Sequence, residues 1–313
     1  MLETSVNLIP DKLDLNSPII IASGTFGYDG YGRGYDTFDS LSKLGAVIPK
    51  TFTMNPRTGN PEPRWYPISF RQGLEDGETI LLNSVGLTNP GIDDGIKYLK
   101  SVKTSMPIPI FGSISGDSVE EFTLMASKIN GTQTCHALEL NLSCPNTETG
   151  SMFSHDKDLV HDVIKNVTGN IALPVIAKLS PNVPNIVEIA KAAVGAGAQA
   201  LTISNTIPAL KIDIKTGSPV LGNIWGGLSG KSLKPISLAL IYQIRKALDI
   251  PIIGVGGVFS AEDIIEYIMA GAQAVQIGSA NLASLQSPIK IHADLEQFMY
   301  ENKLKNLRDI KTI

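Results

Sequence analysis

The sequence predicts an α/β protein in which eight parallel strands close into a barrel surrounded by helices, with long insertions at the C-terminal face. Eight short apolar runs rich in β-branched residues recur along the 313 residues. The runs are continuous rather than alternating, as expected for strands covered on both faces. Helical segments separate them, which implies parallel pairing. Eight such strand-and-helix units predict a (β/α)₈ (TIM) barrel.

The predicted strands follow in order at residues 18–23 (PIIIAS), 46–50 (AVIPK), 107–113 (PIPIFGS), 137–142 (ALELNL), 174–179 (PVIAKL), 199–204 (QALTIS), 251–256 (PIIGVG) and 274–278 (AVQIG). Two helices are visible between them. Residues 185–199 have apolar side chains at near-helical spacing and end in a glycine-containing turn. Residues 260–273 begin with Ser260, a favourable N-cap.

Two connections are longer than a simple repeat needs. Roughly sixty residues separate the second and third strands and about forty-five the sixth and seventh, and insertions of that size in a compact domain are usually functional. Connections that follow barrel strands lie on the active-site face. They contain NSVGLTNPG at residues 83–91 and GNIWGGLSG at residues 222–230. No linker or second domain is visible, so we expect one domain over residues 1–313.

Composition limits the possible partners. The chain is 43% hydrophobic and 18% charged, and its formal charge is −4, which gives no basic footprint for nucleic acid. The N-terminus does not resemble a signal peptide, and we see no long apolar run, so we expect a cytoplasmic protein without a membrane segment. The two cysteines, Cys135 and Cys144, match no zinc or redox pair and cannot supply four cluster thiolates. Any iron–sulfur cluster must therefore lie on another chain.

The four histidines give no support for a metal site. His136, His155, His161 and His292 fall outside the strand ends and form no HxxxH pair, so neither a metal centre nor a Ser/His/Asp triad is expected. His155 follows Cys144 closely enough to approach a site at the barrel mouth. A solvated loop histidine is the simpler interpretation.

Polar residues and glycines end nearly all the predicted strands, where barrel enzymes carry their functional groups. Two of them are lysines at the ends of apolar strands. One alone could extend to solvent, but two facing one mouth indicate an anionic ligand. The glycines after the last two strands could bind a phosphate through backbone N–H groups, or could simply form tight turns. These strand-end residues are Ser23, Lys50, Ser113, Asn141, Lys178, Ser204 with Asn205, Gly256 with Gly257, and Gly278 with Ser279.

Cys144 stands in the segment NLSCPN directly after the fourth strand. Pro145 turns the chain out of the sheet, so Cys144 is expected in a loop over the barrel mouth rather than in the core. Cys135 is interpreted instead as a small buried hydrophobe. Amide side chains around Cys144, those of Asn83, Asn141, Asn146 and Asn205, can both donate to and accept from a planar ligand rich in amide groups.

These motifs, in this order from about Ile19 to Ala280, resemble the class 1 dihydroorotate dehydrogenases, and most closely the class 1B catalytic subunit. Class 2 members use serine as base and have an N-terminal membrane-associating extension, whereas this chain has cysteine and is expected to lack the extension. The resemblance is carried by ASGTFG from Ala22, PKT from Pro49, NSVGLTNPG from Asn83, NLSCPN from Asn141, AKLSPNV from Ala177, SNT from Ser204, GGLSG from Gly226, GVGGV from Gly254 and QIGSA from Gln276.

The resemblance implies oxidation of (S)-dihydroorotate to orotate in de novo pyrimidine (UMP) biosynthesis, with one FMN per chain. Cys144 would remove the C5 proton while the C6 hydrogen leaves as hydride to flavin N5. A thiol suits this task, since its ordinary pKa of about 8.5 is close to working pH. A lysine near flavin N1 would stabilise negative charge on the reduced cofactor.

The implied ligand residues fall into two sets. Substrate would be held by Lys50, Asn83, Val85, Gly86, Leu87, Asn141, Asn205 and Thr206. FMN would be held by Ser23, Lys50, Thr51, Asn141, Lys178, Ser204, Gly230, Gly256, Gly257, Gly278 and Ser279. Two positions depart from the family pattern: Ser113 stands where class 1B usually has a flavin-contacting asparagine, and Val85 replaces isoleucine or methionine.

The class 1B resemblance also implies a partner, an iron–sulfur flavoprotein subunit that carries FAD and a 2Fe–2S cluster and passes electrons to NAD⁺, in a homodimer or heterotetramer. Three alternatives stay open. A class 1A homodimer would reduce fumarate, although NPG at Asn89 favours class 1B. The dihydropyrimidine dehydrogenase type usually has histidine where Asn146 stands. A barrel that binds a phosphorylated ligand without redox chemistry is the third.

Overall fold

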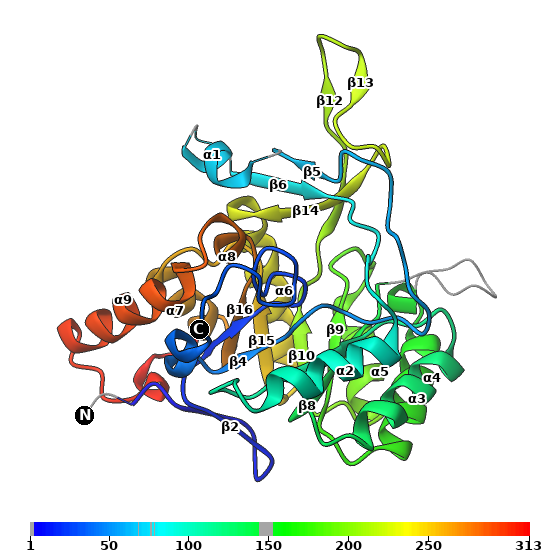
Figure 1. Ribbon diagram of the computed structural model, residues 1–313. Helices are drawn as coiled ribbons and strands as arrows, with labels where there is room; N and C mark the ends of the chain where they lie inside the picture. Colours follow the sequence, from blue (N-terminus) through cyan, green and yellow to red (C-terminus); the bar gives the residue numbers. More distant parts are fainter. Residues whose placement is uncertain (1–2, 68, 76, 78, 144–152) are drawn as a thin grey trace.

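The structure, a computed structural model, describes residues 3–67, 69–75, 77, 79–143 and 153–313. Eight parallel strands pair in the order β4-β3-β16-β15-β10-β9-β8-β7 (Figure 1). Bridges Val47 to Ile110 and Phe52 to Ile114 join the two ends of this sheet and close the barrel. All eight predicted strands, and the (β/α)₈ barrel, are confirmed. Their bounds are β3 (Ile19–Ile21), β4 (Ala46–Val47), β7 (Phe111–Ile114), β8 (Ala137–Asn141), β9 (Val175–Leu179), β10 (Ala200–Ile203), β15 (Ile252–Val255) and β16 (Ala274–Ile277).

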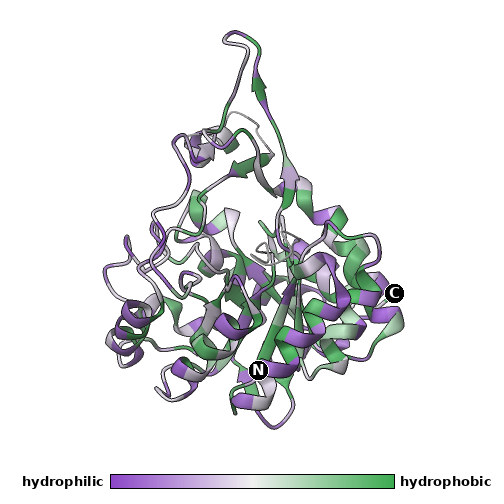
Figure 2. Ribbon diagram, turned by 90° about the vertical axis from the view of Figure 1, so that its right-hand side faces the viewer, coloured by the Kyte–Doolittle hydropathy of each residue, from purple (hydrophilic) through white to green (hydrophobic). Residues whose placement is uncertain are grey.

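Helices surround the barrel and pack apolar faces on it, while polar faces turn to solvent (Figure 2). Both predicted helices are present as α5 (Ile186–Gly195) and α7 (Ala261–Met269). Ser260 caps α7 in a reciprocal capping box with Asp263. The other helices are α2 (Ile92–Lys103), α3 (Val119–Asn130), α4 (Lys157–Asn170), α6 (Lys234–Ala247), α8 (Ser279–Ala283) and α9 (Ser287–Glu301), with short 3₁₀ turns η1 (Asp39–Lys43), η2 (Phe153–His155), η3 (Lys231–Leu233) and η4 (Leu307–Asp309).

An N-terminal hairpin covers the bottom of the barrel. Its strands β1 (Val6–Ile9) and β2 (Leu13–Leu15) pair antiparallel. Leu8 and Leu15 are buried against the lowest inward-facing side chains of the barrel, which form one apolar layer. That layer comprises Ile20, Ala46, Phe111, Ala137, Ile176, Ala200, Ile253 and Ala274. The barrel is therefore filled at its N-terminal end, and open space can exist only toward the opposite end.

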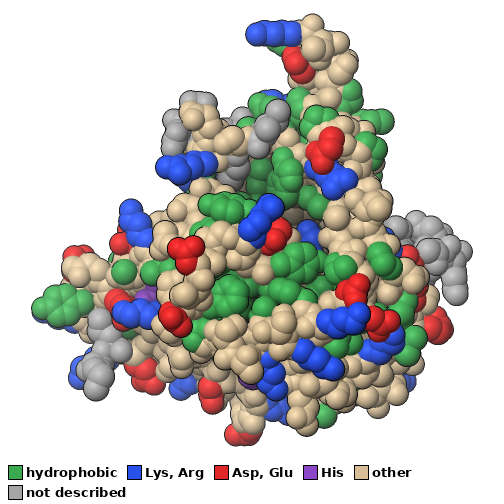
Figure 3. All heavy atoms as spheres, in the orientation of Figure 1, with side chains coloured by type: hydrophobic (Ala, Val, Ile, Leu, Met, Phe, Trp, Pro, Cys, Tyr) green, Lys and Arg blue, Asp and Glu red, His purple; other side chains and the backbone are tan. Residues whose placement is uncertain are grey.

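The two long connections meet above that opposite end. They form a four-stranded antiparallel sheet in the order β11-β14-β6-β5, here called the lobe (Figure 1). A two-stranded hairpin projects beyond it, and a recess separates the lobe from the barrel (Figure 3). The lobe strands are β5 (Trp65–Tyr66), β6 (Ile80–Asn83), β11 (Ile207–Ala209) and β14 (Gly226–Gly230), with α1 (Phe70–Glu75) beside them and β12 (Ile212–Asp213) and β13 (Ser218–Pro219) in the hairpin.

Two further observations concern the chain as a whole. Charged side chains of both signs are scattered over the face drawn in Figure 3. Among the residues with described coordinates, no helix combines the length and apolar character that crossing a bilayer requires.

Candidate active site

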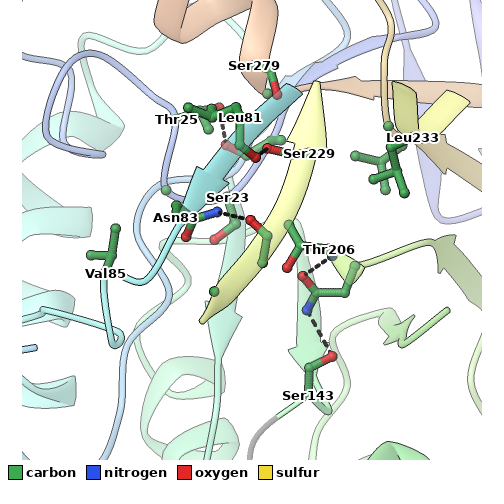
Figure 4. A pocket seen from close by; sticks show the side chains of 18 of the residues that line it. Ser23, Thr25, Leu81, Asn83, Val85, Ser143, Thr206, Ser229, Leu233 and Ser279 are labelled. Atoms are coloured by element: carbon green, nitrogen blue, oxygen red, sulfur yellow. Dashed lines mark hydrogen bonds between the residues drawn. The ribbon is translucent and has the colours of Figure 1, made fainter. Parts of the chain in front are cut away.

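One cavity of about 510 Å³ lies between the C-terminal ends of the barrel strands and the lobe. Figure 4 shows Asn83 and Ser229 projecting from the lobe strands, with Thr206 and Ser143 on the barrel side. Segments from Ala22 near the start of the chain to Leu282 near its end meet here, because every barrel strand ends at this face. The predicted ligand residues that line it are Ser23, Lys50, Thr51, Asn83, Val85, Gly86, Leu87, Asn141, Lys178, Ser204, Asn205, Thr206, Gly256, Gly257, Gly278 and Ser279.

Two predicted site residues, Cys144 and Gly230, are not among the described residues that line the cavity. Cys144 lies outside the described residues, as do Pro145 and Asn146. Gly230 is not among the described residues that line the cavity. Its φ is +94°, and a Cβ there would lie 2.6 Å from the carbonyl oxygen of Thr79, so the lobe backbone alone requires glycine. A role for Gly230 in binding FMN stays a prediction.

Hydroxyl groups form a chain along one wall. Ser23 donates to the carbonyl oxygen of Pro49 at 3.1 Å, and its Oγ lies 2.7 Å from Thr51 Oγ1. Thr51 Oγ1 is in turn 2.9 Å from Ser113 Oγ. Ser113 is buried behind this wall and is not one of the described cavity-lining residues. The serine that departs from the family pattern thus supports Thr51 rather than the cavity surface.

Lys50 lies on the cavity wall at the end of the second barrel strand. Burial lowers the pKa of its ammonium below the ordinary value of 10.5, while Asp29 opposes that shift and Arg64 adds to it. A Cβ on Gly30 would be 3.0 Å from the Lys50 side chain, so the lysine stem is closely packed. A partly desolvated cation of this kind favours an anionic ligand, which would restore the charge balance.

Four residues at or just after the C-terminal ends of β8 and β10 form a hydrogen-bond network around two amide side chains. Asn205 Oδ1 accepts the backbone N–H of Thr206 at 2.8 Å, which directs Asn205 Nδ2 to Asn141 Oδ1 at 3.0 Å and Ser143 Oγ at 2.9 Å. Asn141 Oδ1 also accepts the backbone N–H of Ser143 at 3.3 Å. Backbone donors therefore fix both amide orientations, and the network holds the residue that directly precedes Cys144.

The predicted substrate loop follows β6. Gly86 and Leu87 have positive φ values of 72° and 53°. Asn89, which is buried, holds this turn: its Nδ2 donates to Leu87 O at 2.7 Å and to Thr53 Oγ1 at 2.8 Å. Its Oδ1 accepts the backbone N–H of Gly91 at 2.8 Å. Sequence reasoning used Asn89 only to distinguish subclasses and missed this positioning role.

The Lys178 side chain is buried and has partners on two other barrel strands, so it does not extend freely to solvent at the mouth. Its Nζ donates to Gln276 Oε1 at 3.3 Å and lies 3.7 Å from Glu139 Oε1, which is fully buried. Lys178 and Glu139 both line the cavity. Sequence reasoning treated the strand ALELNL as apolar and missed Glu139. The signal was present, because a charged residue inside a buried strand needs a partner.

Glycines after β15 allow close backbone approach. Gly256 and Gly257 have φ values of 126° and 66°, and a Cβ on either would lie 2.8 Å from its nearest neighbour. Glycine is therefore required at both positions, and both residues line the cavity. Together with the two lysines, this wall fits a ligand with a phosphate and a planar polar ring, as FMN has.

The remaining predictions concern residues around the site. His155, in η2, is exposed and also contributes to the cavity lining. Cys135 is buried, and burial raises the pKa of its thiol to about 11, so it fits the prediction of a buried hydrophobe. No cluster of three or more His, Cys, Asp or Glu able to hold a metal occurs within the described ranges. Trp65 and Trp225, which sequence reasoning did not single out, also line the cavity.

Comparison with known proteins agrees with the site. The family model described as "Dihydroorotate dehydrogenase" matches residues 2–299. A "Dihydroorotate dehydrogenase B (NAD(+)), catalytic subunit" of Desulforudis audaxviator is 38% identical over 95% of this chain and 94% of its own length. A "Dihydroorotate dehydrogenase A (fumarate)" of Lactobacillus delbrueckii is 43% identical over 96% of each chain. The chain therefore belongs to the dihydroorotate dehydrogenase family.

Proposed function

We propose that the chain oxidises (S)-dihydroorotate to orotate in de novo pyrimidine biosynthesis, with FMN as its cofactor. The observation that carries the proposal is the convergence of sixteen predicted ligand residues on one cavity. Family membership supports the same reaction, and the family generally binds FMN. Membership in a dehydrogenase family also favours redox chemistry over a barrel that merely binds a phosphorylated ligand, and dihydroorotate over a pyrimidine base.

The proposed cofactor site is the part of the cavity bounded by the barrel. Ser23, Thr51, Lys178 and Ser204 would hold the ring system, and the glycines after β15 and β16 would hold the phosphate. The chemistry that FMN supplies when bound is uptake of the hydride that leaves substrate C6. Lys178 would place positive charge beside the ring, which favours the reduced state.

The proposed substrate site lies under the lobe. Lys50 would pair with the substrate carboxylate, since its buried ammonium gains a counter-ion there. Asn83, Asn141 and Asn205 would hydrogen-bond the pyrimidine amides and hold the ring in one orientation. Cys144 would accept the C5 proton, and the neighbouring Ser143 is held by Asn205 at 2.9 Å.

Replacing Cys144 with serine tests the proposed base. The variant is expected to retain FMN but to reduce it with dihydroorotate slower by orders of magnitude near neutral pH, because a hydroxyl is a far poorer base than a thiolate. Stopped-flow absorbance of the bound flavin measures this rate. Cys135→Ser is the matched control, since that thiol is buried and outside the proposed site. Near-normal flavin reduction in the Cys144 variant would remove it from the mechanism.

We further propose the class 1B arrangement, in which a partner subunit carrying FAD and a 2Fe–2S cluster transfers electrons to NAD⁺. The Desulforudis relative is named a catalytic subunit, which implies that its enzyme has another subunit. The chain's two cysteines cannot hold a cluster once one is assigned to catalysis. The fumarate enzyme of Lactobacillus delbrueckii is 43% identical to this chain and the Desulforudis catalytic subunit 38%, so the proposal rests on the motifs and the cysteine count and not on identity.

The acceptor is tested by measuring dihydroorotate oxidation with NAD⁺ and with fumarate, for the purified chain alone and with the candidate partner. The class 1B proposal predicts NADH formation only when the partner is present. Robust NADH formation by the isolated chain, or efficient fumarate reduction by a homodimer, would contradict it. The second result would establish the class 1A alternative instead.

A further inference from the structure

Four inward-facing polar side chains, joined to one another by hydrogen bonds and an ion pair, form a layer between the apolar barrel floor and the cavity. They are Glu139 on β8, Lys178 on β9, Thr202 on β10 and Gln276 on β16. Each stands two residues further along its strand than a member of the apolar floor, so strand alternation points it into the barrel. All four are buried. Burying a carboxylate in this layer costs free energy unless the charge is paired and hydrogen-bonded.

The hydrogen bonds of Glu139 do not explain that charge. One oxygen, Oε2, accepts both Gln276 Nε2 at 2.6 Å and Thr202 Oγ1 at 2.8 Å. The amide oxygen of a glutamine could accept the same two donors. The other oxygen, Oε1, is buried without a hydrogen-bond partner and lies 3.7 Å from Lys178 Nζ. The charge of Glu139 is therefore directed at Lys178.

We propose that Glu139 is a positioning and charge-tuning residue for the flavin: it holds Lys178 at the cavity floor and reduces the positive charge that this lysine presents to the cofactor. The inference rests on the proposed FMN site. Gln276 completes the arrangement, because it donates to the carboxylate and accepts from the ammonium. Since a cation beside the ring favours the reduced state, its counter-ion lowers the flavin's electron affinity.

The test is the two-electron reduction potential of bound FMN, measured by equilibration with a reference dye in the absence of dihydroorotate. Glu139→Gln is expected to raise the equilibrium constant for two-electron reduction of FMN about tenfold, which is an upward shift of about 30 mV in the reduction potential. Lys178→Met is expected to lower it. In the double variant the Glu139 substitution should have little further effect, because a buried carboxylate that has lost its cation takes up a proton and no longer carries a charge.

Thr202→Val is the matched control. It removes one hydrogen bond to the same carboxylate but keeps both charges, whereas Glu139→Gln can keep the hydrogen bonds but removes the charge. The tuning role therefore predicts an upward shift for Glu139→Gln and little change for Thr202→Val, and a purely structural role predicts the reverse. If Glu139→Gln does not fold, Glu139→Asp, which withdraws the charge from Lys178, is expected to give a smaller upward shift.

The outcomes separate this inference from the function on which it rests. FMN bound by the wild-type chain, together with an unchanged or lowered potential in the Glu139 variants, would overturn the tuning role and leave the proposed function intact. Failure of the wild-type chain to bind FMN would overturn both. An upward shift that persists at full size without Lys178 would also refute the proposed coupling between the two residues.

Discussion

Truncation of Asn205 to alanine removes three side-chain hydrogen bonds: those to Asn141 Oδ1 at 3.0 Å, to Ser143 Oγ at 2.9 Å and from the Thr206 backbone N–H at 2.8 Å. A typical intramolecular hydrogen bond contributes about 1 kcal/mol. The two that pre-order the proposed substrate site are worth about 2 kcal/mol, and if orotate must supply that order in the variant, its Kd weakens roughly 30-fold. The third is expected to lower the free energy of unfolding by about 1 kcal/mol.

Orotate affinity is measured by titrating FMN-loaded protein and following the flavin absorbance. Asn182→Ala is the matched control, because Asn182 also lines the cavity but its hydrogen bond to Ser180 Oγ is made by the backbone N–H and survives truncation. We expect a much smaller change in that variant. An Asn205→Ala Kd within threefold of wild type would refute the view that this network organises the substrate site.

Four further predictions follow from the cavity and the barrel floor. Orotate binding should weaken as pH rises through the pKa of Lys50, which lies below the ordinary 10.5, because the neutral amine no longer pairs with the orotate carboxylate. Lys50→Met should abolish this pH dependence. The same substitution should raise the free energy of unfolding in urea at neutral pH, since the cost of burying the charged lysine is present below its lowered pKa and is gone above 10.5. Gly86→Ala should weaken orotate binding about tenfold while FMN is retained, because φ is +72° and a Cβ would lie 2.7 Å from the Asn60 nitrogen; an unchanged orotate titration would show that the loop adapts. Leu8→Ala should cost about 3 kcal/mol in urea unfolding without changing FMN content, and a loss below 1 kcal/mol would mean that the hairpin does not seal the barrel.

Sequence alone predicted the barrel and most of the candidate site because both depend on local patterns. Continuous apolar runs mark strands that are covered on both faces, and a barrel brings all their C-terminal ends together. Lys50 and Asn141 could therefore be assigned to one mouth from their strand-end positions, and the cavity contains both. The motif resemblance added the division between cofactor and substrate residues, which strand positions do not supply.

Tertiary structure decided the contacts that join distant strands. The pairing of Glu139 with Gln276 spans 137 residues, and Thr202 reaches the same carboxylate across 63. Such contacts depend on barrel register, which a single strand's sequence does not encode. For the same reason Ser113 proved to lie behind Thr51 rather than on the cavity wall. Residue type and strand position determined which groups reach the barrel mouth, whereas the three-dimensional register determined which of them neutralise, orient and support one another.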